Sequence, residues 1–381
     1  MKKIPFVYGR VADSKDFTDR EQECRHLMQN FSGLVNTIII SPRRWGKTSL
    51  VGKATELLAK EDNSIIVCHV DIFNCRSLEQ FYATYAAAVL KATHTSWGEF
   101  VAGVKKYLGR WAPKVTMSDG AQAYELSFGV DFKDKDYSFD EILDLPQKLS
   151  KDKKKRVVMC IDEFQNISDF EDSLGFQQKL RAHWQQHNKV CYCLYGSKRH
   201  MLMHIFTGYS MPFYKFGDIL FLQKIARQDW IKFIVERFRS AGKQISPELS
   251  GAIADLVQCH SYYVQQLSQQ VWLRTEKVCT RQVVNDAMTA LVAQLSLLFS
   301  NIVDSLTPRQ VNFLLAIANG ESAFSSRVVL QKYNLGASAN IKNLRQSTLD
   351  KDLIDILPNK QLVLQDPIFE YWLRNEYANR K

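Results

Sequence analysis

The sequence lacks the closely paired cysteines from which most protein zinc sites are built. Its eight cysteines include no C-x-x-C pair, and zinc ribbons and fingers rely on such short spacings. Half of them fall inside apolar runs, where cysteine packs as a small hydrophobic residue: Cys68, Cys160, Cys191 and Cys193. We therefore expect no zinc site and a reduced, cytoplasmic protein.

Long hydrophobic runs are also missing. No stretch approaches the roughly 18 consecutive apolar residues that a membrane helix needs. The first residues, Met1–Phe6, are basic but have no apolar core behind them, so we expect no signal peptide and no membrane partner. The formal net charge of +10 permits a nucleic-acid partner but does not require one.

Short apolar, largely β-branched runs alternate with helical stretches in the first part of the chain. They predict a parallel sheet that helices cover on both faces, within an α/β domain over residues 1–225. The less regular segment 93–152 is expected to be an insertion between the second and third strands. The five predicted strands are Thr37–Ile40, Ile65–Val70, Val157–Ile161, Val190–Leu194 and Ile219–Leu222.

The rest of the 381 residues divides into two further patterns. Apolar residues recur at helical spacing over 226–300, which predicts a small helical domain. Over 301–381, three helix starts and then a hairpin follow one another, and this is the order of a winged helix. The helix starts are Thr307, Ser326 and Ser338, and the hairpin strands are Leu353–Leu357 and Gln361–Leu364.

The segment that carries most chemical information is Ser41–Thr48 (SPRRWGKT). It matches G-x-x-x-x-G-K-[ST] except at its first position, and it follows a predicted strand and opens a helix. Backbone amides of such a loop hold phosphate oxygens. Lys47 is predicted to reach the β and γ phosphates of ATP, and the Thr48 hydroxyl to ligate Mg²⁺. The alternative is a chance match in an ordinary strand–helix loop. The predicted nucleotide-binding residues are Ser41, Pro42, Arg43, Arg44, Trp45, Gly46, Lys47, Thr48 and Ser49.

Two acids follow the predicted strand Val157–Ile161. Asp162 is predicted to hold Mg²⁺ through water, and Glu163 to orient and polarise the attacking water. The pair could instead cap the next helix, but the presence of the phosphate loop makes that interpretation the weaker one. A glutamate directly after the Mg²⁺ acid favours hydrolysis of ATP over phosphoryl transfer to a substrate, so we expect an ATPase.

With these motifs the chain resembles the archaeal-type ATPase family, a branch of the AAA+/STAND P-loop ATPases. The resemblance covers nearly the whole chain and implies a RecA-like α/β domain, a helical lid and a C-terminal winged helix. The segments that carry it, in chain order, are Phe17–Glu21 (FTDRE), Pro42–Leu50 (PRRWGKTSL), Ile161–Gln165 (IDEFQ), Tyr195–Ser197 (YGS), Pro212–Lys215 (PFYK) and Tyr262–Gln266 (YYVQQ).

The resemblance also implies roles for single residues. Phe17–Glu21 matches a segment that lies near the adenine. Ser197 stands where related ATPases place a polar sensor of the γ-phosphate, although it could equally cap a helix. Lys215 stands where a cation often reaches the γ-phosphate of a neighbouring subunit, although it could be a solvated loop residue. The lid segment His260–Gln266 lacks the arginine that such lids often offer to the nucleotide.

The partner is less well defined by the sequence. In the expected recognition helix, Ile341, Leu344 and Leu349 are predicted to face the core. The residues predicted to be exposed are Lys342, Asn343, Arg345 and Gln346. DNA could therefore be bound through residues 340–350, although winged helices also bind proteins. We expect a nucleotide-controlled switch with a protein partner. The rivals are a DNA-binding loader of the initiator kind and a nucleotide-binding interaction module with negligible turnover. Self-association is left open.

Overall fold

The computed structural model describes residues 4–9, 19–94, 96–108, 113–118, 123–128, 139–357 and 359–378. The chain forms two compact units. The α/β unit comprises Arg20–Ser41 and Lys47–Leu222. The helical unit comprises Gln223–Lys381 together with the N-terminal segment up to Asp19 and the loop Pro42–Gly46. The middle of the predicted phosphate loop thus belongs to the helical unit.

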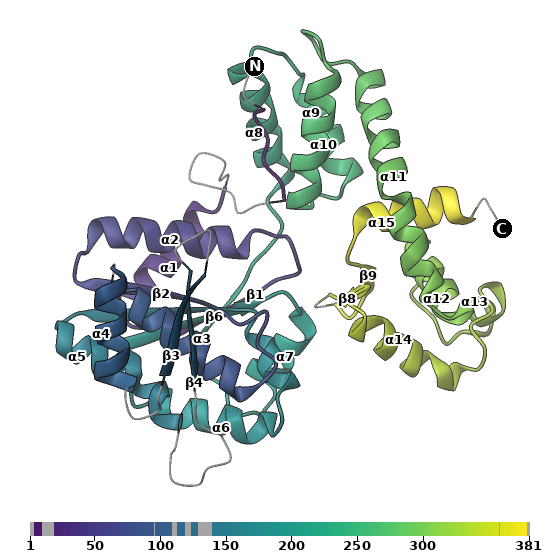
Figure 1. Cartoon of the computed structure of the whole chain (residues 1–381). Coiled ribbons are helices and arrows are strands. Elements are labelled where there is room, and N and C mark those ends of the chain that lie inside the picture. The colour runs from purple at the N-terminus through teal and green to yellow at the C-terminus, as the bar shows by residue number, and fades with distance from the viewer. Residues whose placement is uncertain are drawn as a thin grey trace. The chain divides into compact units, whose positions relative to one another are not determined.

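The α/β unit is built on a five-stranded parallel sheet with the strand order β2-β5-β6-β1-β7 (Figure 1). All five predicted strands are present, which confirms the α/β class. Strand β6 is buried along its whole length, as expected for a strand with helices on both faces. The strands are β1 (Thr37–Ile40), β2 (Ile65–Asp71), β5 (Arg156–Asp162), β6 (Val190–Gly196) and β7 (Asp218–Phe221).

Helices flank this sheet, and the predicted insertion contributes two of them together with a hairpin. The helices are α1 (Glu21–Ser32), α2 (Lys47–Glu61), α3 (Leu78–Lys91), α4 (Trp97–Leu108), α5 (Leu145–Lys153), α6 (Ser173–Trp184) and α7 (Arg199–Thr207). The hairpin consists of β3 (Pro113–Ser118) and β4 (Ala123–Phe128), which pair antiparallel. In a parallel sheet all strands end at one edge, and ligands of α/β proteins bind at that edge. Strands β1, β5 and β6 therefore bring their following residues together there.

The helical unit contains the predicted lid helices and the predicted winged helix. Its first helices are α8 (Arg227–Ser240), α9 (Pro247–Leu256), α10 (Ser261–Arg274) and the long α11 (Arg281–Asp304). The winged helix consists of α12 (Pro308–Ala318), α13 (Arg327–Lys332), α14 (Ile341–Asp350), β8 (Ile354–Ile356), β9 (Leu362–Leu364) and α15 (Pro367–Trp372). Its three helices and hairpin follow the predicted order.

Local signals explain where these helices begin. Thr307 caps α12 through a capping box with Gln310, and such reciprocal bonds satisfy two amide donors at the helix start. The Ser326 side chain caps α13. The predicted third start, Ser338, opens a single 3-10 turn before α14. The predicted turn residue Pro358 lies outside the described residues.

A single hydrophobic core runs through the helical unit. The Phe299 ring on α11 lies 5.2 Å from that of Phe369 and 5.7 Å from that of Trp372, both on α15. The division into a lid at 226–300 and a winged helix at 301–381 stays a prediction, but the two segments share this core. Removal of the winged helix would therefore expose buried apolar surface on α11.

Helix α11 also has the length and apolar composition of a membrane-spanning segment. Core helices of globular proteins often pass the same test. Val284, Leu291 and Phe299 of α11 are buried in the helical unit, so the core accounts for part of this apolar character.

Candidate nucleotide-binding site

The predicted phosphate loop has the expected local setting. Strand β1 ends at Ile40, the loop follows, and α2 begins at Lys47. Gly46 has a φ of +88°, a conformation that favours glycine. Ser41, the departure from the motif, is buried and is not among the described residues with positive φ. Serine is therefore compatible with the backbone at the motif's first position.

Lys47 and Thr48 make the contacts that a phosphate and magnesium site needs. Lys47 is 6% exposed, and its ammonium donates across the loop to the Ser41 carbonyl at 3.4 Å. The Thr48 hydroxyl donates to Oδ2 of Asp162 at 2.8 Å. Magnesium takes one or two carboxylates together with waters and phosphate oxygens. A hydroxyl and a carboxylate side by side at the start of α2 and the end of β5 therefore fit Mg²⁺ bound to a nucleotide.

Burial makes the Asp162 carboxyl a weaker acid than an ordinary aspartate. It raises the pKa of this carboxyl to about 6, although the Thr48 hydroxyl and the Glu163 amide, which both donate to it, oppose the rise. Because the pKa is higher in the folded than in the unfolded chain, this group stabilises the fold only when it is protonated. That contribution is lost as the pH rises towards 6. A bound cation would favour the ionised form instead.

Magnesium-dependent ATP binding should therefore weaken below pH 6. Protonated Asp162 cannot hold a cation, so the affinity should fall by up to about tenfold per pH unit below 6 and stay flat between pH 7 and 8. Titration calorimetry with ATP, in Mg²⁺ and in EDTA, measures the dependence. The control is Asp162→Asn, which should remove this component and leave the titration of ATP itself. An identical pH profile in both proteins would contradict the assignment.

The Glu163 carboxylate is held by neighbours from two elements. The backbone of Glu163 has a φ of +55°, in the left-handed region. Its Oε2 accepts hydrogen bonds from the Ser197 amide at 3.2 Å, the Ser197 hydroxyl at 2.8 Å and the Gln165 amide nitrogen at 2.6 Å. Asp162 is the last residue of β5, and Ser197 directly follows the neighbouring strand β6. The fold thus places Lys47, Thr48, both acids and Ser197 in one unit at one sheet edge.

Gly196 leaves room for this arrangement. A Cβ there would overlap with Oε1 of Gln165 and lie 3.2 Å from the Glu163 Cα. Gly196→Ala should therefore lower the free energy of unfolding by about 1–3 kcal/mol through overpacking. Gly52 in α2 is the matched control, because a Cβ there meets no atom within 4 Å. Gly52→Ala should stabilise the chain by about 0.5–1 kcal/mol. Urea unfolding measures both, and equal effects would contradict the packing argument.

Comparison with known families bears on this geometry. Residues 45–171 match the KAP family P-loop domain, and residues 297–375 match a probable winged helix domain. The chain thus contains a P-loop NTPase domain and a probable winged helix domain. The resemblance inferred from the motifs is confirmed at this level, and so is the RecA-like α/β fold. No curated protein matches the chain.

Solved structures resemble this chain along nearly its whole length. The Walker-type ATPase PABY2304 of Pyrococcus abyssi has a TM-score of 0.66 at 13% identity, covering 97% of this chain and 99% of that one. The ORC2 protein of Aeropyrum pernix, in ADPNP–ADP complexes, has a TM-score of 0.56 at 14% identity, covering 98% of each chain. At such identities the likeness establishes the fold alone.

The remaining residues with predicted roles lie in several different environments. Ser197 does not cap α7, because the N-cap is Lys198 and the Ser197 hydroxyl donates to Glu163 instead. Arg43 is exposed. Lys215 is also exposed, in the loop between α7 and β7, with its ammonium 5.4 Å from the Tyr214 ring centroid. Of the segment assigned to the adenine, Phe17 and Thr18 lie outside the described residues. The roles of these residues stay predictions.

For some residues at the site, the sequence did not predict the contacts that the structure shows. Gln165 binds Glu163, and Asp71 is the register partner of Asp162 across β2 and β5. A signal for Asp71 existed, since two neighbouring parallel strands both end in aspartate. Tyr262 belongs to a segment that carries the resemblance, but no local signal pairs it with Arg44, whose guanidinium carbon lies 4.6 Å from the centroid of its ring.

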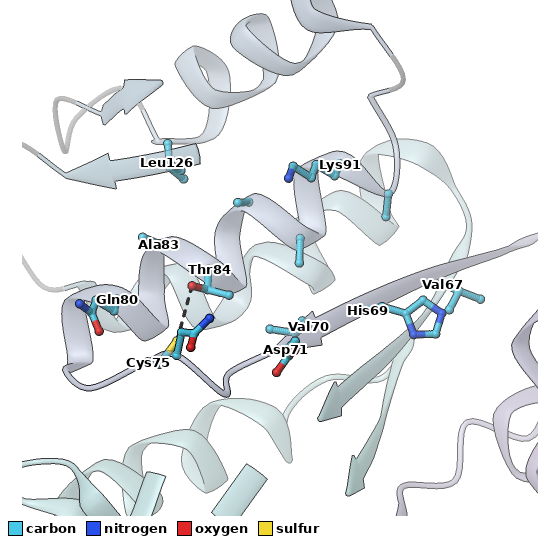
Figure 2. A pocket seen from close by; sticks show the side chains of 14 residues that line it. Val67, His69, Val70, Asp71, Cys75, Gln80, Ala83, Thr84, Lys91 and Leu126 are labelled. Atoms are coloured by element: carbon cyan, nitrogen blue, oxygen red, sulfur yellow. Dashed lines mark hydrogen bonds between the residues drawn. The ribbon is translucent and has the colours of Figure 1, made fainter. Parts of the chain in front are cut away.

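Asp71 also lines a pocket of about 790 Å³. Figure 2 shows the pocket between β2 and the small-residue face of α3, with Leu126 of β4 on its far side. Strand β2 is an edge strand of the sheet, which leaves this side open. None of the residues predicted from the sequence to bind nucleotide or magnesium lines this pocket.

Proposed function

We propose that this P-loop NTPase binds ATP with Mg²⁺ at the phosphate loop, hydrolyses it, and uses the nucleotide state as a switch for a macromolecular partner. The observation that carries the proposal is the hydrogen bond between Thr48 and Asp162, because it joins the end of the loop to the acid pair. Adenine nucleotides are favoured because the Aeropyrum ORC2 protein, which shares the fold, is described in ADPNP–ADP complexes.

The residues divide the work by their chemistry. Lys47, a buried residue at the start of α2, supplies a positive charge for the β and γ phosphates. Bound Mg²⁺ supplies further positive charge to the phosphates, and Thr48 and Asp162 would hold it. Glu163 orients the attacking water and accepts its proton, while Ser197 and Gln165 fix the carboxylate that does so. Lys215 of a second copy would add charge from outside, and a self-associated form would then be the active one.

Steady-state phosphate release tests the proposal. With ATP and Mg²⁺ the chain should release many phosphates per chain, and EDTA should stop the release. A burst of one phosphate per chain, or none, would favour the interaction module without turnover. We also propose a cytoplasmic location, which the eight free thiols support because disulfides are rare in reducing compartments.

The DNA-binding loader is the second candidate, and the surface of α14 favours it. Lys342, Asn343, Arg345 and Gln346 are exposed, whereas Leu344 and Leu349 are buried. Exposed side chains of these types can contact phosphates and base edges. Two basic residues would give only a shallow salt dependence, with a slope near −2 on a log–log plot. DNA affinity that does not change with salt, or with Lys342→Ala, would remove this candidate.

A further inference from the structure

Arg44 lies in the phosphate loop, yet its guanidinium is engaged by the helical unit. Arg44 has a left-handed φ of +60°, and its guanidinium carbon lies 4.6 Å from the Tyr262 ring centroid on α10. Both residues belong to the same compact unit. A cation over an aromatic face is attracted only weakly where the cation is exposed, and Arg44 is exposed. A stronger anionic partner would therefore displace it easily.

The next residue of α10 continues this contact into the winged helix. The Tyr263 ring lies edge-on to Tyr262 with their centroids 5.3 Å apart. The buried Tyr263 hydroxyl donates to Oδ2 of Asp366 at 2.5 Å. Asp366 is the N-cap of α15, and its Oδ1 accepts the Ile368 and Phe369 amides at 2.9 and 3.0 Å. One carboxylate thus ties α10 to the first turn of α15.

A second chain of contacts runs from the loop to the same helix. The Trp45 ring centroid lies 5.8 Å from the Lys224 ammonium. Lys224 donates to the Gln258 carbonyl at 2.8 Å, and the Gln258 side-chain amide donates to the Glu370 carboxylate at 3.0 Å. Glu370 lies on α15. Two neighbouring loop residues are therefore connected to one short helix by separate routes.

We propose that these contacts form a relay through which the phosphate loop reports a bound nucleotide to the winged helix. Phosphates draw Arg44 away from Tyr262, the bond between Tyr263 and Asp366 loosens, and α15 is released. The relay rests on the proposed function, since it assumes that ATP binds at the loop. Its physical basis is that arginine binds phosphate bidentately with charge-assisted hydrogen bonds, which are stronger than its contact with a ring.

The charge of Arg44 also affects the protonation of Asp366, in the direction that the relay requires. Burial raises the pKa of this carboxyl, and the Tyr263 hydroxyl, the capped amides and the Arg44 charge oppose the rise. Removal of Arg44 takes away one of the groups that favour the ionised cap. A ligand shifts an equilibrium only if it binds the two states with unequal affinity. Here the nucleotide binds more tightly when Arg44 has left the Tyr262 ring and can contact the phosphates.

Hydrogen–deuterium exchange of the full chain tests the relay, with and without Mg²⁺ and a non-hydrolysable ATP analogue. In the wild type, the analogue should speed exchange in peptides that contain α15 by at least about threefold. Tyr263→Phe removes only the hydroxyl, so its α15 should exchange at the fast rate with or without the analogue. Its affinity for the analogue should stay within threefold of wild type. Asp366→Asn keeps a capping side chain and should give the same result if Tyr263→Phe folds poorly.

Tyr333→Phe is the matched control. It removes a hydroxyl that donates to Glu321 at 3.3 Å within the same winged helix, and it should preserve the wild-type response. An α15 that exchanges equally with and without bound analogue in the wild type would overturn the relay and leave the proposed function intact. Loss of the response in Tyr333→Phe would also overturn it, because the effect would then be general loosening. Failure of the wild type to bind the analogue, measured separately by calorimetry, would end both proposals.

Discussion

Lys47→Ala should weaken ATP binding by about a hundredfold or more, equivalent to roughly 2.7 kcal/mol. Lys47 is 6% exposed, and its ammonium donates to the Ser41 carbonyl at 3.4 Å. Charge-assisted bonds to phosphate are strong in such a setting because little water screens them. Alanine leaves those phosphate charges without this partner. Calorimetric titration of ATP into both proteins gives the difference directly.

Lys60→Ala is the control for this prediction. Lys60 lies on the same helix, α2, but is exposed and pairs with Glu56 at the surface. Surface pairs of this kind contribute little, so ATP affinity should stay within about threefold, or ~0.7 kcal/mol. If Lys47→Ala binds ATP as well as Lys60→Ala does, the phosphate-loop assignment is wrong.

Glu163→Gln should keep ATP binding and lose turnover by on the order of a hundredfold or more. Glutamine has nearly the same shape, and its carbonyl oxygen can still accept from the Ser197 amide and hydroxyl. It cannot accept a proton from water. Phosphate release at saturating ATP reports the loss, and calorimetry reports the unchanged affinity.

Glu171→Gln serves as the matched control, since Glu171 is an exposed glutamate between the acid pair and α6. It should hydrolyse ATP at the wild-type rate. Wild-type turnover in Glu163→Gln would show that another group positions the water. A joint loss of binding and turnover would instead assign Glu163 to nucleotide binding.

The sheet was predictable because its strands are short and continuously apolar. A strand buried on both faces, such as β6, has no polar position to obscure it, and the carboxyl-edge rule then places the loop and both acids together. Thr307 and Ser326 could be identified as helix caps because capping depends on residues three apart. Predictions succeeded where the determinant is local or follows from strand order.

The contacts that join distant segments were not predictable. The setting of Glu163 depends on Ser197 from the end of β6, and only the strand order brings the two together. The sequence predicts Arg44 as a nucleotide-binding residue but does not predict its contact with the Tyr262 ring, because Tyr262 lies far away in the sequence. The core shared by α11 and α15 was likewise hidden, since amphipathic periodicity shows that a face is buried but not against which element.

A structure of the chain with Mg²⁺ and a non-hydrolysable ATP analogue tests the central claim most directly. The account predicts the phosphates within the loop Ser41–Thr48 with the Lys47 ammonium on them. It also predicts Mg²⁺ about 2.1 Å from the Thr48 hydroxyl, with Asp162 bonded to its waters. An analogue bound elsewhere, for example in the pocket between β2 and α3, with Lys47 and Thr48 making no contact to it, would contradict the account.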